Sequence, residues 1–196
     1  AHVRFLYSNG SMYKCCNSNL LYHGCIPMTE NREFDGLMVG GKMYRGKELM
    51  DFIDTQVKTA YFLPEDAPEK EACRAFMWYL WNGAKSPVFG KDKNRSFEHY
   101  FIEDPEVMRE TMNPYYQLSE EEETCDMILK EFGLPTKGSH IINGHMPVKI
   151  KSGETPIRAG GKLFIIDGGL SKAYQERTGI AGYTLIFNSH HLALAE

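Results

Sequence analysis

A chain of 196 residues is long enough to bury a substantial core, and we expect residues 1–196 to form a single domain. Its apolar share of 42% and charged share of 24% are typical of a soluble globular protein, and no apolar run reaches the roughly 18 residues of a membrane helix. The net charge of -4 argues against a nucleic-acid partner, because a generally basic surface is missing.

The cysteines favour a reducing environment. Their number, five, is odd and their spacing is not that of a disulfide framework, so we expect a cytoplasmic location. Cys15, Cys16, His23 and Cys25 lie close enough in the sequence to suggest a zinc site. Adjacent cysteines rarely converge on one ion, however, and the Cys-x2-Cys spacing of structural zinc sites is absent. We therefore interpret the thiols mainly as small buried side chains.

The first elements in chain order are a short helix and a hairpin. The sequence predicts a helix over 2–7 and then two strands, 12–16 and 20–23, around a turn of Asn and Ser residues at 17–19. A further strand is predicted over 33–39, where the following Gly-Gly pair ends it.

Helices dominate the middle of the chain. Apolar residues recur at helical spacing over 46–63 and over 68–82, with a proline or glycine after each stretch. Residues 83–96 are polar, rich in lysine and punctuated by glycine, which indicates a long ordered loop. A capping-box pattern that starts at Ser119 predicts another helix, which Gly and Pro end near 133–135.

The last third of the chain is rich in strand-forming residues. Short runs separated by Gly, Pro, Asn or Ser predict strands at 141–142, 148–150, 163–166, 183–187 and 192–194. We expect mixed, largely antiparallel pairing, with strands at both ends of the chain and a helical middle segment. The fold class is therefore α+β.

Two histidines occur in the same local setting. His23 and His145 each follow a short apolar run, lie beside a glycine and precede a proline. A strand that ends in a tight turn presents its last side chain at the sheet edge, and neutral imidazole is the commonest nitrogen ligand of divalent metals. A single histidine of this kind is more often structural, but the pair suggests half of a metal site.

Several long blocks resemble one known family. They are WNGAKSPVFGKDK at 81–93, IINGHMPVK at 141–149, GKLFIIDGGLSKAY at 161–174 and TGIAGYTL at 178–185, together with the segment around His23. With these blocks the chain closely resembles the class III fructose-1,6-bisphosphatases of bacteria over essentially its whole length. That family is similar to the calcineurin-like metallophosphoesterases. The resemblance thus implies part of a metallophosphoesterase-like β-sandwich flanked by helices, with a two-metal centre at the strand ends.

The resemblance also implies a division of the metal ligands. In such enzymes the motifs in chain order are Asp-x-His, Gly-Asp-x-x-Asp, Gly-Asn-His, a lone His followed by Gly, and Gly-His. Only the last two occur here, at His23 and His145, and the first three would precede Ala1. Both histidines would then ligate the same metal. The chain would be the C-terminal portion of the catalytic unit, inactive on its own, with Mn²⁺ as the expected metal and Mg²⁺ as the alternative.

The implied reaction is hydrolysis of fructose 1,6-bisphosphate to fructose 6-phosphate and phosphate, a gluconeogenic step. A substrate with two phosphates needs cations besides the metals. The loop at 85–95 supplies four cations, and we predict that Lys91, Lys93 and Arg95 contact phosphate. A merely solvated loop is the alternative.

Two further residues are weaker candidates for the site. His140 could orient a metal ligand from outside the site, and Asp167 could hydrogen-bond a ligand or a metal-bound water. The glycine pair after Asp167 more simply indicates a turn. The sequence assigns no catalytic acid or base.

Other functions stay open. The chain could be a non-catalytic module that binds phosphorylated ligands or assembles with a partner chain, or a phosphoesterase of other specificity, because motifs do not define pocket shape. The expected partners are fructose 1,6-bisphosphate and the missing N-terminal portion of the same protein. Neither a nucleic acid nor a membrane is expected, and a homo-oligomer remains open.

Overall fold

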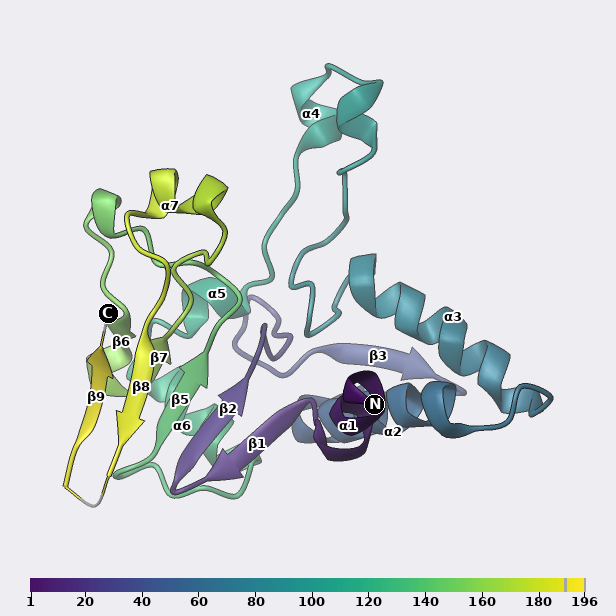
Figure 1. Cartoon of the computed structure of the whole chain (residues 1–196), viewed down its shortest axis with the longest axis horizontal. Helices are drawn as coiled ribbons and strands as arrows, with labels where there is room; N and C mark the ends of the chain where they lie inside the picture. The colour runs from purple at the N-terminus through teal and green to yellow at the C-terminus, as the bar shows by residue number, and fades with distance from the viewer. Residues whose placement is uncertain (189, 196) are drawn as a thin grey trace. The chain divides into compact units, whose positions relative to one another are not determined.

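The computed structural model describes residues 1–188 and 190–195 of the chain (Figure 1). These residues form two compact units, each assembled from two separate stretches of sequence. Unit 1 consists of Ala1–Met12 and Cys25–Gln117, and unit 2 consists of Tyr13–Gly24 and the chain from Leu118 onward. Helices and strands occur in both units, which confirms the α+β class. The single domain and the β-sandwich stay predictions.

Unit 1 is mainly helical. Its elements are α1 (His2–Asn9), β3 (Gly36–Val39), β4 (Lys42–Arg45), α2 (Gly46–Phe62), α3 (Pro68–Asn82), η1 (Glu98–Tyr100), α4 (Pro105–Met108) and α5 (Tyr115–Leu118), which reaches the end of the unit. The predicted strand at 33–39 begins only at Gly36, and β4 is a partner that the sequence analysis missed. Gly40 and Gly41 both have positive φ, so they turn the chain directly back into an antiparallel hairpin.

The core of unit 1 lies where α2 packs against α3 (Figure 1). Leu49 and Ile53 are four residues apart, so they lie on one face of α2, where both are fully buried against Leu80 of α3 and Leu37 of β3. Burying each such side chain contributes about 1.5–3 kcal/mol. The predicted helical periodicity is therefore confirmed.

Unit 2 is built on a five-stranded sheet. In spatial order its strands are β1 (Tyr13–Cys16), β2 (Asn19–Tyr22), β5 (His140–Asn143), β7 (Leu163–Ile165) and β6 (Ile157–Arg158). The pairs β2–β5 and β5–β7 are parallel, whereas the two outer pairs are antiparallel. The two central pairs therefore bring the carboxyl ends of β2, β5 and β7 to one edge of the sheet.

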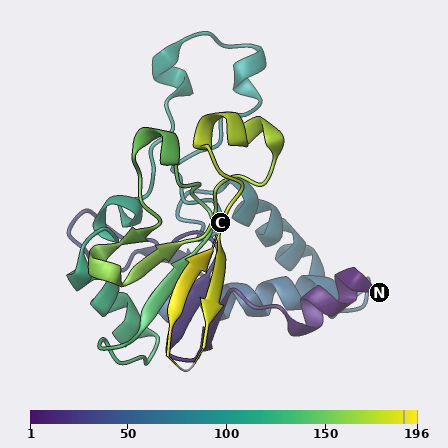
Figure 2. The same cartoon turned by 60° about the vertical axis from the view of Figure 1, so that its left-hand side comes forward.

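The remaining elements of unit 2 lie before, between and after the strands of this sheet along the chain. They are α6 (Glu122–Glu131), η2 (Ile150–Ser152), η3 (Ala159–Gly161), α7 (Lys172–Thr178), β8 (Thr184–Phe187) and β9 (Leu192–Ala195). Helix α6 packs against β5, and β8 and β9 form a separate antiparallel hairpin (yellow in Figure 2). Among the described residues four of the six strand pairs are antiparallel, which confirms mixed, largely antiparallel pairing.

The β1–β2 hairpin confirms the predicted turn. Asn17 and Ser18 form a two-residue loop with φ values of 50° and 60°. This is the left-handed backbone that matches the twist of the two strands, and asparagine adopts it more readily than most residues. The resulting register opposes Tyr13 to Tyr22, so that β2 ends immediately before His23.

Two predictions about local structure are wrong. Residues 148–150 form no strand, because the Val148 N–H donates one hydrogen bond to the Asp167 carbonyl and the chain then enters η2. Ser119 does not cap a helix, because it lies in a turn after α5 and α6 begins only at Glu122. The sequence analysis also missed β6 and α7, which are only two and seven residues long.

The cysteines divide into two groups. Cys25, Cys73 and Cys125 are buried, as predicted, whereas Cys15 and Cys16 are exposed on the outermost strand of the sheet. Burial raises the pKa of the Cys25 thiol to about 12. All five thiols are free within the part of the chain that the structure describes.

Over 1–188 and 190–195, every helix is too short or too polar to cross a bilayer.

Candidate metal site

The two predicted histidines meet at the carboxyl-terminal edge of the parallel strands. His23 directly follows β2, and His145 follows β5 by two residues, after the register has paired Tyr22 with Asn143. The Nε2 atom of His23 lies 3.0 Å from the Nδ1 atom of His145. The two rings are 4.8 Å apart and inclined by 74°. Ligands of open sheets bind at such edges, and His23 is exposed there.

The spacing of these nitrogens suits a shared metal ion. Two imidazole nitrogens at about 2.1 Å from one ion, on adjacent coordination positions about 90° apart, are separated by about 3.0 Å. The same distance also fits a hydrogen bond between a neutral donor ring and a neutral acceptor ring. Among the described residues no third His, Cys, Asp or Glu completes a metal-binding group with this pair. The 3.0 Å distance therefore fits either two ligands of one metal or a hydrogen bond between the two rings.

Asn143 links the two histidine segments, and the sequence analysis did not single it out. Its side-chain Nδ2 donates to the Gly24 carbonyl, just after His23, and its Oδ1 accepts from the His145 backbone N–H at 3.3 Å. The backbone N–H of Gly144 adds a bond of 3.2 Å to the His23 carbonyl. An asparagine directly before the Gly-His pair is the sequence signal that could have found it.

The chain after His145 is also held in place. The Val148 N–H donates to the Asp167 carbonyl at 2.8 Å, and the Lys149 N–H donates to Glu154 Oε2 at 3.0 Å. Glu154 in turn accepts from Arg158, which belongs to β6. The segment carrying His145 is therefore tied both to the turn after β7 and to β6.

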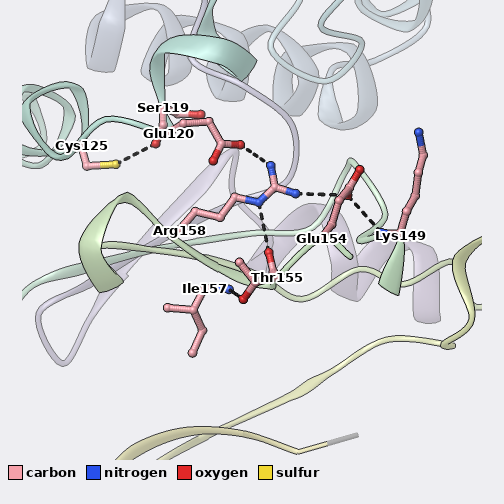
Figure 3. A network of polar contacts seen from close by, with 8 residues as sticks. All are labelled: Ser119, Glu120, Cys125, Lys149, Glu154, Thr155, Ile157 and Arg158. Atoms are coloured by element: carbon pink, nitrogen blue, oxygen red, sulfur yellow. Dashed lines mark hydrogen bonds and ion pairs between the residues drawn. The ribbon is translucent and has the colours of Figure 1, made fainter. Parts of the chain in front are cut away.

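Arg158 is the centre of the polar network drawn in Figure 3. Its guanidinium pairs with Glu120 and with Glu154, the latter at 3.3 Å, and its Nε donates to the Thr155 carbonyl at 3.2 Å. The side chain is only one-fifth exposed, so these ion pairs are less screened by solvent than surface pairs. The network therefore links the turn between α5 and α6, which contains Glu120, to β6, which contains Arg158.

Asp167 lies at the same edge of the sheet as the histidines, two residues beyond β7. Its Oδ1 accepts from the Gly169 N–H at 2.8 Å, which is an Asx turn. The structure thus shows the turn that the glycine pair indicated. A role in binding a ligand or a metal-bound water stays a prediction.

His140 lies at the opposite end of β5 from the site. It is the first residue of a four-residue strand that Asn143 ends, so its Cα is about 10 Å from that of Asn143 at the usual strand rise. Its Nδ1 is 2.9 Å from the Gly161 carbonyl, and its ring packs edge-on against Phe164. The predicted role of orienting a metal ligand is not supported by this position.

The predicted phosphate-binding cations belong to unit 1, whereas the histidines belong to unit 2. Lys91 Nζ pairs with Glu110 at 2.6 Å, and Arg95 pairs with Glu98 at 2.8 Å. Lys93 makes no ion pair within the described residues and is half-buried. Of the three predicted residues, Lys93 is therefore the one whose charge is available to a ligand without breaking an existing pair.

The base of this loop is closed by reciprocal bonds. The Asp92 N–H donates to the Thr111 carbonyl, and the Thr111 N–H donates to Asp92 Oδ1. The two ends of the segment 91–112 therefore lie side by side (Figures 1 and 2). Desolvation alone would raise the pKa of Glu110, but hydrogen bonds from Lys91 and from the Arg95 backbone outweigh it and hold that pKa below its usual value.

Gly90 should tolerate no side chain at the start of this loop. Its φ is +68°, and an added Cβ would lie 2.3 Å from the Oη atom of Tyr116. We expect Gly90→Ala to lower the free energy of unfolding by about 3 kcal/mol, from left-handed strain and overpacking together. Gly40→Ala is the control, because Gly40 has φ +57° but no atom near the added Cβ. Urea denaturation of both variants measures the difference, and equal losses would contradict the predicted clash.

An α+β chain with two histidines converging at the carboxyl ends of parallel strands has a candidate metal site. The comparison with known families is more specific. Residues 1–196 match the sequence model of the family described as Firmicute fructose-1,6-bisphosphatase. The chain belongs to this family, as its resemblance to the class III enzymes predicted.

Individual relatives agree with this assignment. The chain is 55% identical to fructose-1,6-bisphosphatase class 3 1 of Clostridium beijerinckii, over 98% of this chain and 29% of that protein. It is 53% identical to the class 3 enzyme of Fusobacterium nucleatum, over 99% of this chain and 30% of that protein. For the class 3 enzyme of Finegoldia magna the values are 50%, 100% and 30%. The chain thus spans less than a third of the length of these relatives. No solved structure matches it.

Proposed function

We propose that this chain supplies the two-histidine half of a two-metal centre that hydrolyses fructose 1,6-bisphosphate to fructose 6-phosphate and phosphate. The observation that carries the proposal is the 3.0 Å approach of His23 Nε2 to His145 Nδ1 at the carboxyl ends of β2 and β5. The family membership and the names of the relatives support the choice of substrate.

The proposed chemistry assigns limited tasks to this chain. A pair of divalent cations binds phosphate, lowers the pKa of a bridging water, and stabilises the attacking and leaving oxygens. His23 and His145 would ligate one of these cations through the two facing nitrogens. The aspartate-containing motifs would come from a part of the same polypeptide that precedes Ala1. Lys93, with Lys91 and Arg95, would neutralise phosphate charge.

The metal identity and the cellular setting are part of the proposal. Mn²⁺ is the expected metal, with Mg²⁺ as the alternative, because the class III enzymes suggest it. Imidazole nitrogen also suits Zn²⁺ and Fe²⁺, so elemental analysis has to identify the ion that is bound. We place the protein in the cytoplasm and its reaction in gluconeogenesis.

Comparing the full-length protein with this chain tests the proposal. The full-length protein should release phosphate from fructose 1,6-bisphosphate when Mn²⁺ is added, whereas the 196-residue chain alone should release none. Intact mass establishes which species is assayed, and a phosphate-release assay measures turnover.

Each other outcome has a clear meaning. Activity of the isolated chain would show that its site is complete without further ligands. An inactive full-length protein that still binds fructose 1,6-bisphosphate would favour a non-catalytic module, and turnover of other phosphomonoesters alone would favour a different specificity.

A further inference from the structure

We infer that Asn143 is the positioning residue that sets the separation of the two histidines. The inference rests on the proposed function, because the separation matters only if His23 and His145 bind one ion. Asn143 acts through the two backbone segments that carry the histidines, and its carboxamide spans the gap between them.

The carboxamide has one partner in each segment. Nδ2 donates to the carbonyl of Gly24, the residue after His23, and Oδ1 accepts from the N–H of His145 itself. The carbonyl needs a donor and the N–H needs an acceptor, so only one orientation of the amide satisfies both. The side chain is 4% exposed, so water cannot readily replace either partner.

The backbone of Asn143 is held on both sides. It pairs with Tyr22 of β2 on one side and with Ile165 of β7 on the other, and its carbonyl accepts from the Ile166 N–H at 2.8 Å. The central position in the sheet leaves the side chain little freedom to move. A movement of either histidine segment would therefore break a bond to a fixed group.

Neither leucine nor aspartate, which are similar in size to asparagine, offers the same pair of bonds. Leucine has the right volume but would leave the Gly24 carbonyl and the His145 N–H without their partner. An ionised aspartate accepts from His145 but cannot donate to Gly24, and it would place two oxygens in contact. The requirement for one donor and one acceptor accounts for asparagine at this position.

Asn19 provides a matched control within the same sheet. It is also 4% exposed, and its Nδ2 donates to the Asn17 carbonyl at 3.1 Å. It lies at the first position of β2, opposite His140, and so at the end of the sheet away from His23. Asn19→Ala removes a buried carboxamide without touching the histidine segments.

The experiment compares metal affinity in the full-length protein. Mn²⁺ binding is titrated calorimetrically, and bound metal after dialysis is measured by elemental analysis, for wild type, Asn143→Ala, Asn143→Ser and Asn19→Ala. We expect both Asn143 variants to bind Mn²⁺ about 10- to 100-fold more weakly, as is usual when a residue that orients a ligand is lost. Asn19→Ala should bind with wild-type affinity despite a comparable loss of thermal stability.

Three results would overturn the inference. They are wild-type Mn²⁺ affinity in both Asn143 variants, an equal loss in Asn19→Ala, and global unfolding of both Asn143 variants by circular dichroism. His145→Ala separates this failure from that of the proposed function. If His145→Ala loses metal while Asn143→Ala keeps it, only the role of Asn143 is wrong. If His145→Ala also keeps its metal, the proposed metal site itself is wrong.

Discussion

Replacing His145 with alanine in the full-length protein should abolish metal-dependent hydrolysis and reduce metal content in the same variant. His145 offers one of the two nitrogens that lie 3.0 Å apart, so its loss leaves His23 as a single imidazole on this side of the site. We expect kcat/KM for fructose 1,6-bisphosphate to fall by about 10³-fold or more, since a metal's electrostatic stabilisation is worth several kcal/mol.

The measurement pairs phosphate release at saturating Mn²⁺ with elemental analysis of the dialysed protein. His190→Ala serves as the control, because it removes an exposed histidine from the β8–β9 connection, at a distance in sequence from both strands of the site. Full activity of His145→Ala at saturating Mn²⁺ would rule out the assignment of His145 as a ligand. Loss of activity with unchanged metal content would instead make it a group that contacts substrate.

Lys93→Met should weaken catalysis without changing metal content. A charge-assisted hydrogen bond to phosphate is worth about 1.5–3 kcal/mol, so its loss should lower kcat/KM by roughly 10- to 100-fold. Methionine keeps most of the length of the side chain and removes its charge. Lys93 is the better test of the loop because Lys91 and Arg95 already hold ion pairs with Glu110 and Glu98.

Lys91→Met would be harder to interpret than Lys93→Met, because Lys91 already forms an ion pair. Removing Lys91 deprives Glu110, whose side chain is 22% exposed, of its ion-pair partner, so a loss of activity there mixes a structural effect with a catalytic one. Lys47→Met, on the exposed face of α2, controls for the loss of one positive charge. Identical kinetics for Lys93→Met, Lys47→Met and wild type would show that the loop is merely solvated.

Sequence reasoning succeeded where the local structure depends on residues close together in the sequence. Helices α2 and α3 follow from apolar residues at helical spacing, and the β1–β2 turn follows from an Asn-Ser pair that adopts positive φ. The prediction failed at 148–150, where a segment of strand-like composition makes only one hydrogen bond to the Asp167 carbonyl and then enters a 3-10 turn. Composition describes what a segment prefers but not what lies beside it.

The sequence by itself identified the family, the α+β class and the two candidate metal ligands His23 and His145. These features depend on residue identity and local periodicity. Only the tertiary structure decided that β2 and β5 are parallel neighbours, which brings together two rings 122 positions apart. It alone placed His140 at the other end of β5, tied Lys91 and Arg95 to carboxylates, and assigned the bridging bonds to Asn143. Pairing between strands distant in sequence depends on which surfaces the whole fold buries, so no local pattern specifies it.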